Sequence, residues 1–291
     1  MKKMILVISK HEVSLLAAFL SLISVQIGAA IAKKIFPILG AESVALMRLG
    51  LSAILLWIMF QPWKGLNQNV YWKDLICYGL ILSLMNLLIY KAFSYLSVGI
   101  AISIEVLGPL AIAIFMSRHK LDLVWGILAL IGLVLFPFGK IANNFSYIGM
   151  LYALGAAVCW GLYIIYGAKV AQGGGNSVAI GMAIAALCAS PFGIWNISDI
   201  FSSSWILLLC FLVSLLSSTI PFLLDIFAMK TLSPKIFGIL LSTSPIVSAL
   251  AGWIILGEKL SNYQLIGITI IMLSCMGCFL CAYKKSKSYL T

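Results

Sequence analysis

Long apolar segments follow one another along nearly the whole 291-residue chain. A helix needs about 20 predominantly apolar residues to cross the hydrocarbon core of a bilayer. We predict ten such segments, at residues 13–32, 42–60, 75–95, 98–116, 123–138, 147–167, 177–196, 204–228, 236–256 and 262–282. Only 9% of the residues are charged, against about 25% in soluble domains. The sequence therefore predicts an all-α integral membrane protein with ten transmembrane helices in the lipid bilayer.

The basic residues are divided unevenly between the two sides of these segments. If the N-terminus lies inside, the outer side carries only Lys33, Lys34, Lys91, Lys140 and Lys259. The other Lys and Arg residues fall inside, apart from Arg48, which lies within a segment. Cytoplasmic loops of membrane proteins carry an excess of Lys and Arg. The pattern predicts that both termini are cytoplasmic, and it accounts for the net charge of +11 without a nucleic-acid partner.

Two stretches of the chain recur in its second half. ESVALM, from Glu42, returns 134 residues later as NSVAIG, and LSVGIAISIEVLGPLAIAI, from Leu96, returns 136 residues later as LSPKIFGILLSTSPIVSAL. The two offsets nearly agree, which predicts two repeats, residues 13–139 and 147–282, of five helices each. Because five is odd, the second repeat enters the membrane from the opposite side. Inverted repeats of this kind are a transporter architecture, with the substrate site at the repeat interface.

Five polar side chains of the first half are predicted to lie at one depth. With a rise of about 1.5 Å per residue, Gln26, Arg48, Asn86, Tyr90 and Glu105 all fall about 7–13 Å from the outer ends of their helices. Charged groups at such depth usually face the bundle interior or a water-filled cavity. We predict a substrate site in which Arg48 binds a carboxylate, Glu105 binds an ammonium group and the other three orient polar groups. The alternative is an Arg48–Glu105 ion pair that only holds two helices together.

A proline interrupts a predicted helix at matching positions of the two halves. Pro109 cannot donate a hydrogen bond to the carbonyl of Glu105, and Pro245 leaves the carbonyl of Leu241 without its helical donor in the same way. Broken helices in transporters expose backbone groups to substrates and ions. We therefore predict helix breaks at Pro109 and Pro245 that take part in gating, and Glu105 as the first candidate for proton coupling.

The polar groups of the second half lie nearer the predicted inner side. They are Trp160, Tyr163, Asp225, Ser242, Thr243 and Ser244. Trp160, Tyr163 and Ser242 are predicted to contact the substrate, and Asp225 is a second candidate for coupling. Two alternatives stay open: the Asp225 side chain extends from its helix end toward water, and the hydroxyl groups bond to carbonyls of their own helix.

The sequence predicts no cofactor and no metal site. Cys275, Cys278 and Cys281 have the C-x-x-C-x-x-C spacing of some iron–sulfur ligands, but they lie in a continuous apolar helix and indicate packing. His11 and His119 lie at predicted helix ends, with no metal-ligand spacing and no nucleophile–base pair. The chain also has no ATP-binding motif. These observations argue against an enzyme and favour a transporter driven by an ion gradient.

The stretch LGEKLSNYQLIGITIIMLSCMG matches a transporter signature. Gly257, Glu258, Leu260, Gln264 and Gly267 fit the pattern G-E-x-L-x-x-x-Q-x-x-G. With ten helices in two halves of five, the chain resembles the EamA family of the drug/metabolite transporter superfamily. The resemblance runs nearly end to end, through GAAIAKKIFPILGA, MNLLIYKAF and GIAISIEVLGPLAIAIFMSR.

This resemblance implies a secondary transporter of the bacterial inner membrane. It implies export of small neutral amino acids of the threonine/homoserine type, or of related metabolites, by proton antiport. The chain departs from such exporters at Leu241–Ser244, which lacks their acidic residue, and at Asp225, where they have glutamate. Arg48 at the depth of Glu105 favours a zwitterionic substrate. The alternatives are efflux of cationic or aromatic small molecules, and a membrane scaffold that transports nothing.

Overall fold

The computed structural model describes residues 2–65, 71–116, 120–138, 145–195, 203–229, 232 and 234–288, and within them it contains no strand. Its helices are α1 (Lys2–Leu39), α2 (Ala41–Phe60), α3 (Trp72–Tyr95), α4 (Val98–Glu105), α5 (Leu107–Met116), α6 (Lys120–Val134), α7 (Tyr147–Val170), α8 (Gly174–Gly193), α9 (Ser204–Ser214), α10 (Ile220–Met229), α11 (Pro234–Leu241), α12 (Ser244–Leu256) and α13 (Asn262–Ser288). Two 3₁₀ turns, η1 (Pro62–Lys64) and η3 (Ala171–Gly173), and a π-helical turn, η5 (Leu215–Thr219), join them. Arg118, Lys140 and Lys230, which enter the predicted charge asymmetry, lie outside the described residues.

Nine helical segments of the described chain are long and apolar enough to cross a membrane, and the apolar segment Asp122–Val134 is shorter. Three of the nine are interrupted within the membrane: α4 with α5, α9 with η5 and α10, and α11 with α12. Large apolar side chains such as Phe115, Leu187 and Ile254 are exposed along these spans. Such a surface suits lipid and not water. The protein is an all-α, multi-pass membrane protein.

The fifth predicted segment is shorter than the sequence analysis expects. The prediction of 123–138 is wrong at its end, because α6 ends at Val134 and the next two residues form tighter turns that bond three residues back. Pro137 supplies the physical reason. It has no amide hydrogen, and it disfavours helical backbone at the residue before it.

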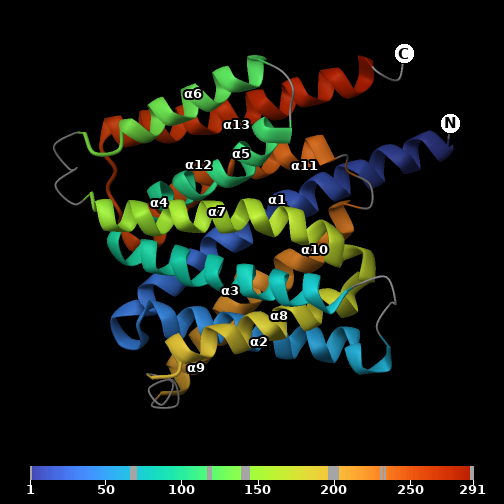
Figure 1. Cartoon of the computed structure of the whole chain (residues 1–291), viewed down its shortest axis with the longest axis vertical. Coiled ribbons are helices and arrows are strands. Elements are labelled where there is room, and N and C mark those ends of the chain that lie inside the picture. The colour runs from blue at the N-terminus through green and yellow to red at the C-terminus, as the bar shows by residue number, and fades with distance from the viewer. Residues whose placement is uncertain are drawn as a thin grey trace.

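Helices of the first half pack directly on helices of the second half (Figure 1). α3 lies against α7 and α1 lies against α10, while α2 pairs with α8, the α4–α5 span with α12, and α6 with α13. If each helix is replaced by its counterpart in the other half, the α3–α7 contact becomes the α1–α10 contact. The other three contacts each join a helix to its own counterpart and stay the same. Two repeats of opposite orientation produce this pattern. α1 begins and α13 ends on the same side of the bundle, at the right of Figure 1.

Small residues set the closest crossings between the broken spans and their neighbours. A Cβ atom on Gly108 of α5 would collide with the carbonyl group of Ala157 in α7. A Cβ atom on Gly28 of α1 would collide with Ser217 in η5. Such small residues let helix backbones approach closely in membranes. The broken spans are therefore held against α1 and α7 by close helix contacts at these two glycines.

Candidate functional site

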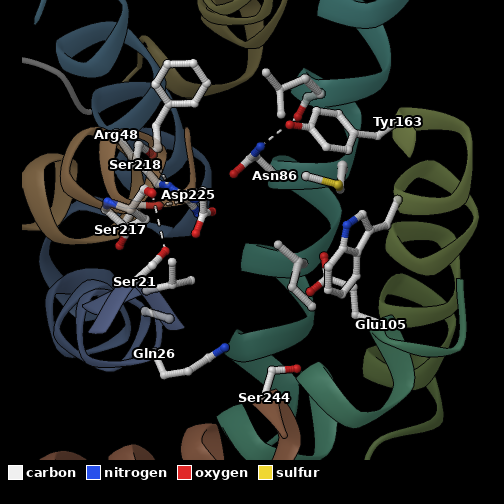
Figure 2. Close-up of a pocket in the computed structure, with 18 of the residues that line it drawn as sticks. Ser21, Gln26, Arg48, Asn86, Glu105, Tyr163, Ser217, Ser218, Asp225 and Ser244 are labelled. Atoms are coloured by element: carbon white, nitrogen blue, oxygen red, sulfur yellow. Dashed lines mark hydrogen bonds between the residues drawn. The ribbon is translucent and has the colours of Figure 1, made fainter. Parts of the chain in front are cut away.

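A cavity of about 270 Å³ lies between the two halves (Figure 2). Its walls come from α1, α2, α3, α4, α7 and α8, and from the broken spans of the second half. The predicted site residues that line it are Gln26, Arg48, Asn86, Tyr90, Glu105, Trp160, Tyr163 and Asp225. Three predicted residues do not line it: Ser242, Pro109 and Pro245. Ser21, Tyr78, Ser217, Ser218 and Ser244 contribute polar groups as well.

Arg48 is held against the broken α9–η5–α10 span. Its Nε donates to the Ser218 hydroxyl at 2.9 Å, and Nη2 donates to the Ser217 carbonyl at 2.9 Å. Nη1 donates to the Tyr90 hydroxyl at 3.4 Å, and the guanidinium carbon lies 5.5 Å from the centre of the Tyr90 ring. These contacts use one hydrogen on each guanidinium nitrogen. The guanidinium has five N–H donors, so two are left without an acceptor among the described residues.

The chain around Pro221 explains why η5 offers these acceptors. Pro221 has no amide hydrogen, so the carbonyl four residues before it, that of Ser217, has no helical donor. The π-helical turn also disturbs the pairing of the carbonyl before it, and the Ser24 hydroxyl donates to Leu216 there at 2.7 Å. Side chains of α1 and α2 thus occupy carbonyls that the broken span exposes. In the sequence, Pro221 predicts an unpaired carbonyl at Ser217 in the same way as Pro109 does at Glu105 and Pro245 at Leu241.

Glu105 is the last residue of α4, and its side chain is only 7% exposed. Ion pairs between described residues join Lys33 to Glu258, Lys91 to Glu42 and Lys169 to Asp74, and none joins Arg48 to Glu105. Figure 2 shows the two side chains on different walls of the cavity. The alternative, an Arg48–Glu105 ion pair that only holds two helices together, is therefore not present in the described structure. A cation and a carboxylate that share a cavity without pairing can take opposite ends of one ligand.

The hydroxyls at the break between α11 and α12 divide into two kinds. Ser242 donates to the carbonyl of Ile239 and Thr243 to that of Leu240, each at 2.7 Å. These two follow the alternative that such groups bond to their own helix. Ser244 lines the cavity, and its hydroxyl has no hydrogen-bond partner among the described residues.

Aromatic side chains form one wall of the cavity. The rings of Tyr78 and Tyr163 lie 5.3 Å apart between centres, and the Tyr78 hydroxyl donates to that of Tyr163 at 3.5 Å. Trp160, one turn earlier on α7, lines the same wall. On α3, the Asn86 amide donates to the Leu82 carbonyl at 2.8 Å. This wall offers flat apolar contact with a few polar groups, as small-molecule sites commonly do.

Asp225 also lines the cavity, from α10. The neighbouring Ser21 hydroxyl of α1 donates to the Pro221 carbonyl at 3.3 Å, one turn before Asp225 on the same helix. In Figure 2 it lies near Arg48, Ser218 and Ser21. The side chain is thus turned toward the cavity, in contrast to the alternative in which it extends to the membrane surface.

The signature residue Glu258 joins three segments beyond the cavity, at the end of the bundle opposite to the termini. Its Oε1 accepts from the Lys33 ammonium at 2.7 Å, and its Oε2 accepts from the Val98 amide, the first residue of α4, at 2.9 Å. The same ammonium donates to the Leu96 carbonyl at 2.6 Å. Glu258 therefore caps the helix that ends in Glu105 and ties it to α1. From the sequence, Glu258 is recognised only as part of the signature motif, because its partners lie far away along the chain.

Two other signature residues hold α13 to α6. The Gln264 side chain accepts from the Ser261 amide at 2.9 Å, which caps α13, and donates to the Phe136 carbonyl at 3.2 Å. A Cβ atom on Gly267 would lie 2.6 Å from the Gly132 carbonyl oxygen, so only glycine permits this crossing. These residues support the fold near Glu258 and do not reach the cavity.

Comparison with known proteins agrees with this architecture. A solved structure, described only as the crystal structure of a protein, matches with a TM-score of 0.61 at 19% identity and covers 95% of this chain and 98% of that one. At that identity, the match supports the fold alone.

Sequence comparison is more specific. The threonine/homoserine exporter RhtA of Escherichia coli (strain K12) is 37% identical over 266 residues, 91% of this chain and 90% of the relative. The same-named protein of Salmonella typhimurium (strain LT2) is 36% identical over 265 residues, 90% of each chain. The model of the EamA-like transporter family matches residues 147–280. With relatives of this similarity over nearly its whole length, the chain belongs to the EamA-like transporter family.

Proposed function

We propose that this protein exports small neutral amino acids of the threonine/homoserine type, or closely related metabolites. The relatives that carry the name threonine/homoserine exporter support this substrate class. The site supports it independently, because an amino acid at neutral pH carries one carboxylate and one ammonium group.

The observation that carries the proposal is the separation of Arg48 and Glu105. Both line one cavity, and no ion pair joins them. We assign the substrate carboxylate to the unused donors of Arg48, whose planar fork suits bidentate contact. We assign the ammonium group to Glu105. In this proposal Gln26, Asn86 and Tyr90 orient polar groups, while Trp160 and Tyr163 provide apolar contact.

Transport is proposed to be coupled to protons through Glu105. A carboxylate in a cavity that alternately faces water and protein changes its affinity for protons as its surroundings change. Release of a proton from Glu105 would make room for the substrate ammonium, which gives exchange of one for the other. Asp225, which lines the same cavity, is the second candidate for this coupling.

The proposed setting is the bacterial inner membrane, with both termini in the cytoplasm. The uneven distribution of Lys and Arg supports this orientation. Residues 13–139 and 147–282 would form the two repeats that move against each other. In a cysteine-free background, a cysteine at exposed position 147 should react with an impermeant reagent added outside cells, and one at position 64 should not.

The contacts of Glu258 are proposed to close the outer end of the transport path. They join α1, the start of α4 and the turn before α13 through one carboxylate. A path that opens to the outside at this end has to separate some of these groups. The α4 helix would then carry the movement to Glu105 at its other end.

The aromatic wall favours a second candidate function, efflux of cationic or aromatic compounds. Tyr78, Tyr163 and Trp160 can stack on flat molecules, and Glu105 can bind a cation. The position of Arg48 opposes a cationic substrate, since a positive charge already faces the cavity.

Flux measurements decide between these candidates. The purified protein in proteoliposomes with an imposed pH gradient is expected to move labelled threonine and homoserine. Ethidium and similar aromatic cations should not compete. Movement of the cations without movement of any amino acid would overturn the proposal in favour of the second candidate.

A further inference from the structure

Three buried polar atoms that line the cavity have no hydrogen-bond partner among the described residues, and one of them, Oγ of Ser217, lies on the Arg48 side. The other two are Oε1 of Gln26 from α1 and Oγ of Ser244 from α12. Gln26 is 4% exposed and Ser244 is 2% exposed. Both residues line the cavity, and Figure 2 shows them near each other below Arg48 and Glu105.

Neighbouring hydroxyls in the same spans are satisfied. Ser24 on α1 donates to the Leu216 carbonyl at 2.7 Å, and Ser248 on α12 donates to the Pro245 carbonyl at 2.8 Å. Ser244 cannot bond back to Leu240 in the usual way, because that carbonyl already accepts from the amide and the hydroxyl of Thr243. Buried polar atoms are nearly always hydrogen-bonded, so a missing partner for both residues in one cavity indicates a ligand group.

The chemistry of the pair defines that group. An amide carbonyl accepts a hydrogen bond, and a serine hydroxyl either donates or accepts one. A hydroxyl group on the ligand, which donates one hydrogen bond and accepts others, can bond to the Gln26 amide and to Ser244 at the same time. A methyl group in its place would leave both protein atoms buried and unpaired, which a site of this kind rejects strongly.

We propose that Gln26 and Ser244 bind the side-chain hydroxyl of the substrate and make the transporter select hydroxyl-bearing amino acids. This inference rests on the proposed function, in which Arg48 and Glu105 hold the two charged groups. The substrate side chain then extends from the α-carbon toward α1 and α12. The two residues come from different halves, so selection requires both halves to close on one substrate.

The test is competition in proteoliposomes that hold the full-length protein. Uptake of labelled L-threonine is measured against unlabelled L-threonine and L-valine, which differ by a methyl group in place of the hydroxyl. L-homoserine and L-norvaline form a second matched pair. Wild-type protein is expected to prefer the hydroxyl member of each pair.

The variants Ser244→Ala and Gln26→Met are expected to reduce that preference by about two- to tenfold each, the factor that one net hydrogen bond supplies. The change should come from weaker competition by threonine and homoserine, with valine and norvaline unchanged or stronger. Ser248→Ala is the matched control, because it removes a buried hydroxyl one turn further along α12 that does not face the cavity. Its preference should equal that of the wild type.

The outcomes separate this inference from the proposed function. If threonine is transported but Ser244→Ala and Gln26→Met both keep the wild-type preference, buried water satisfies these atoms and the inference is wrong. Equal competition by threonine and valine in the wild type also overturns it, while amino-acid export stands. If no amino acid is transported, the proposed function itself fails. Should Ser244→Ala not insert, Gln26→Met on α1 decides the question alone.

Discussion

The broken spans α4–α5 and α11–α12 occupy equivalent places in the two halves but carry different chemistry. α4 ends at Glu105, a carboxylate that lines the cavity without an ion-pair partner among the described residues. α11 ends at Leu241, and the two hydroxyls that follow bond to carbonyls of their own helix. The backbone break is thus common to both halves, whereas the titratable group belongs to one. An inverted repeat supplies the geometry twice, and side-chain divergence decides which copy carries the titratable group.

The span α9–η5–α10 shows a third use of a break. Its carbonyls at Leu216 and Ser217 accept from Ser24 and Arg48 of the first half. Here the exposed backbone joins the two halves. The same departure from helical pairing therefore joins the two halves in one span and ends in a cavity-lining carboxylate in another.

The largest expected effect is the loss of Glu105, which would remove the difference between α4–α5 and α11–α12. Glu105→Gln keeps the shape and hydrogen-bonding ability of the side chain but cannot titrate. We expect it to abolish export driven by a pH gradient, measured as flux of labelled threonine in proteoliposomes. Glu105→Asp should retain part of the activity with a shifted pH profile. Wild-type flux from well-inserted Glu105→Gln protein would mean that the carboxylate is only structural.

The next effect concerns Arg48, which joins α2 to η5 and also faces the cavity. Arg48→Lys keeps the charge but loses the planar donors. We expect the KM for threonine to rise about tenfold or more, because hydrogen bonds to charged groups contribute about 1.5–3 kcal/mol each. Ser24→Ala is the matched control, since it removes another contact to η5 but does not line the cavity. It should lower the Tm and leave the KM unchanged; a KM that rises equally in both variants would assign Arg48 to structure alone.

A smaller effect is expected at the other end of α4. Glu258→Gln removes the charge that caps Val98 and pairs with Lys33. A helix cap contributes about 1 kcal/mol, which corresponds to about a fivefold change in an equilibrium between conformations. We expect faster labelling, from outside, of a cysteine placed at position 29 in the cavity wall. Glu42→Gln breaks the Lys91–Glu42 pair, which does not involve α4, and should leave the labelling rate unchanged. Equal rates in both variants would argue against an outer closure at Glu258.

The smallest effects are expected from substitutions at Pro109 and Pro245. Each proline follows one helix break, so the two variants compare the two breaks. Pro109→Ala gives α5 an amide that can bond to the Glu105 carbonyl. We expect a loss of flux of about two- to fivefold, on the order of 0.4–1 kcal/mol. The amide after Pro109, that of Leu110, bonds four residues back to Val106, whereas the amide after Pro245, that of Ile246, bonds only three residues back to Thr243, so helical pairing does not continue across the second break. Pro245→Ala should therefore change flux less than Pro109→Ala, and the reverse order would mean that the second-half break is the more important one.

The membrane segments and the depth of the polar residues can be predicted from the sequence, because both depend on distance along a helix. Apolar length predicts the membrane segments, and the rise per residue predicts that Gln26, Arg48, Asn86, Tyr90 and Glu105 share a level. All five line one cavity in the structure. The exception among the segments is α6, where Pro137 ends the helix early.

Which side chains of each helix face the cavity was decided only by packing. Successive residues turn by about 100°, so depth does not tell whether Ser242 or Ser244 faces the cavity, and the structure places Ser244 there. Depth likewise could not separate a paired from an unpaired Arg48 and Glu105. The contact of α1 and α2 with η5 gives Arg48 acceptors of its own, and Glu105 has no ion-pair partner among the described residues. The sequence by itself determined which groups reach the middle of the membrane, and the tertiary structure decided which of them already have partners, because partners come from helices far apart in the chain.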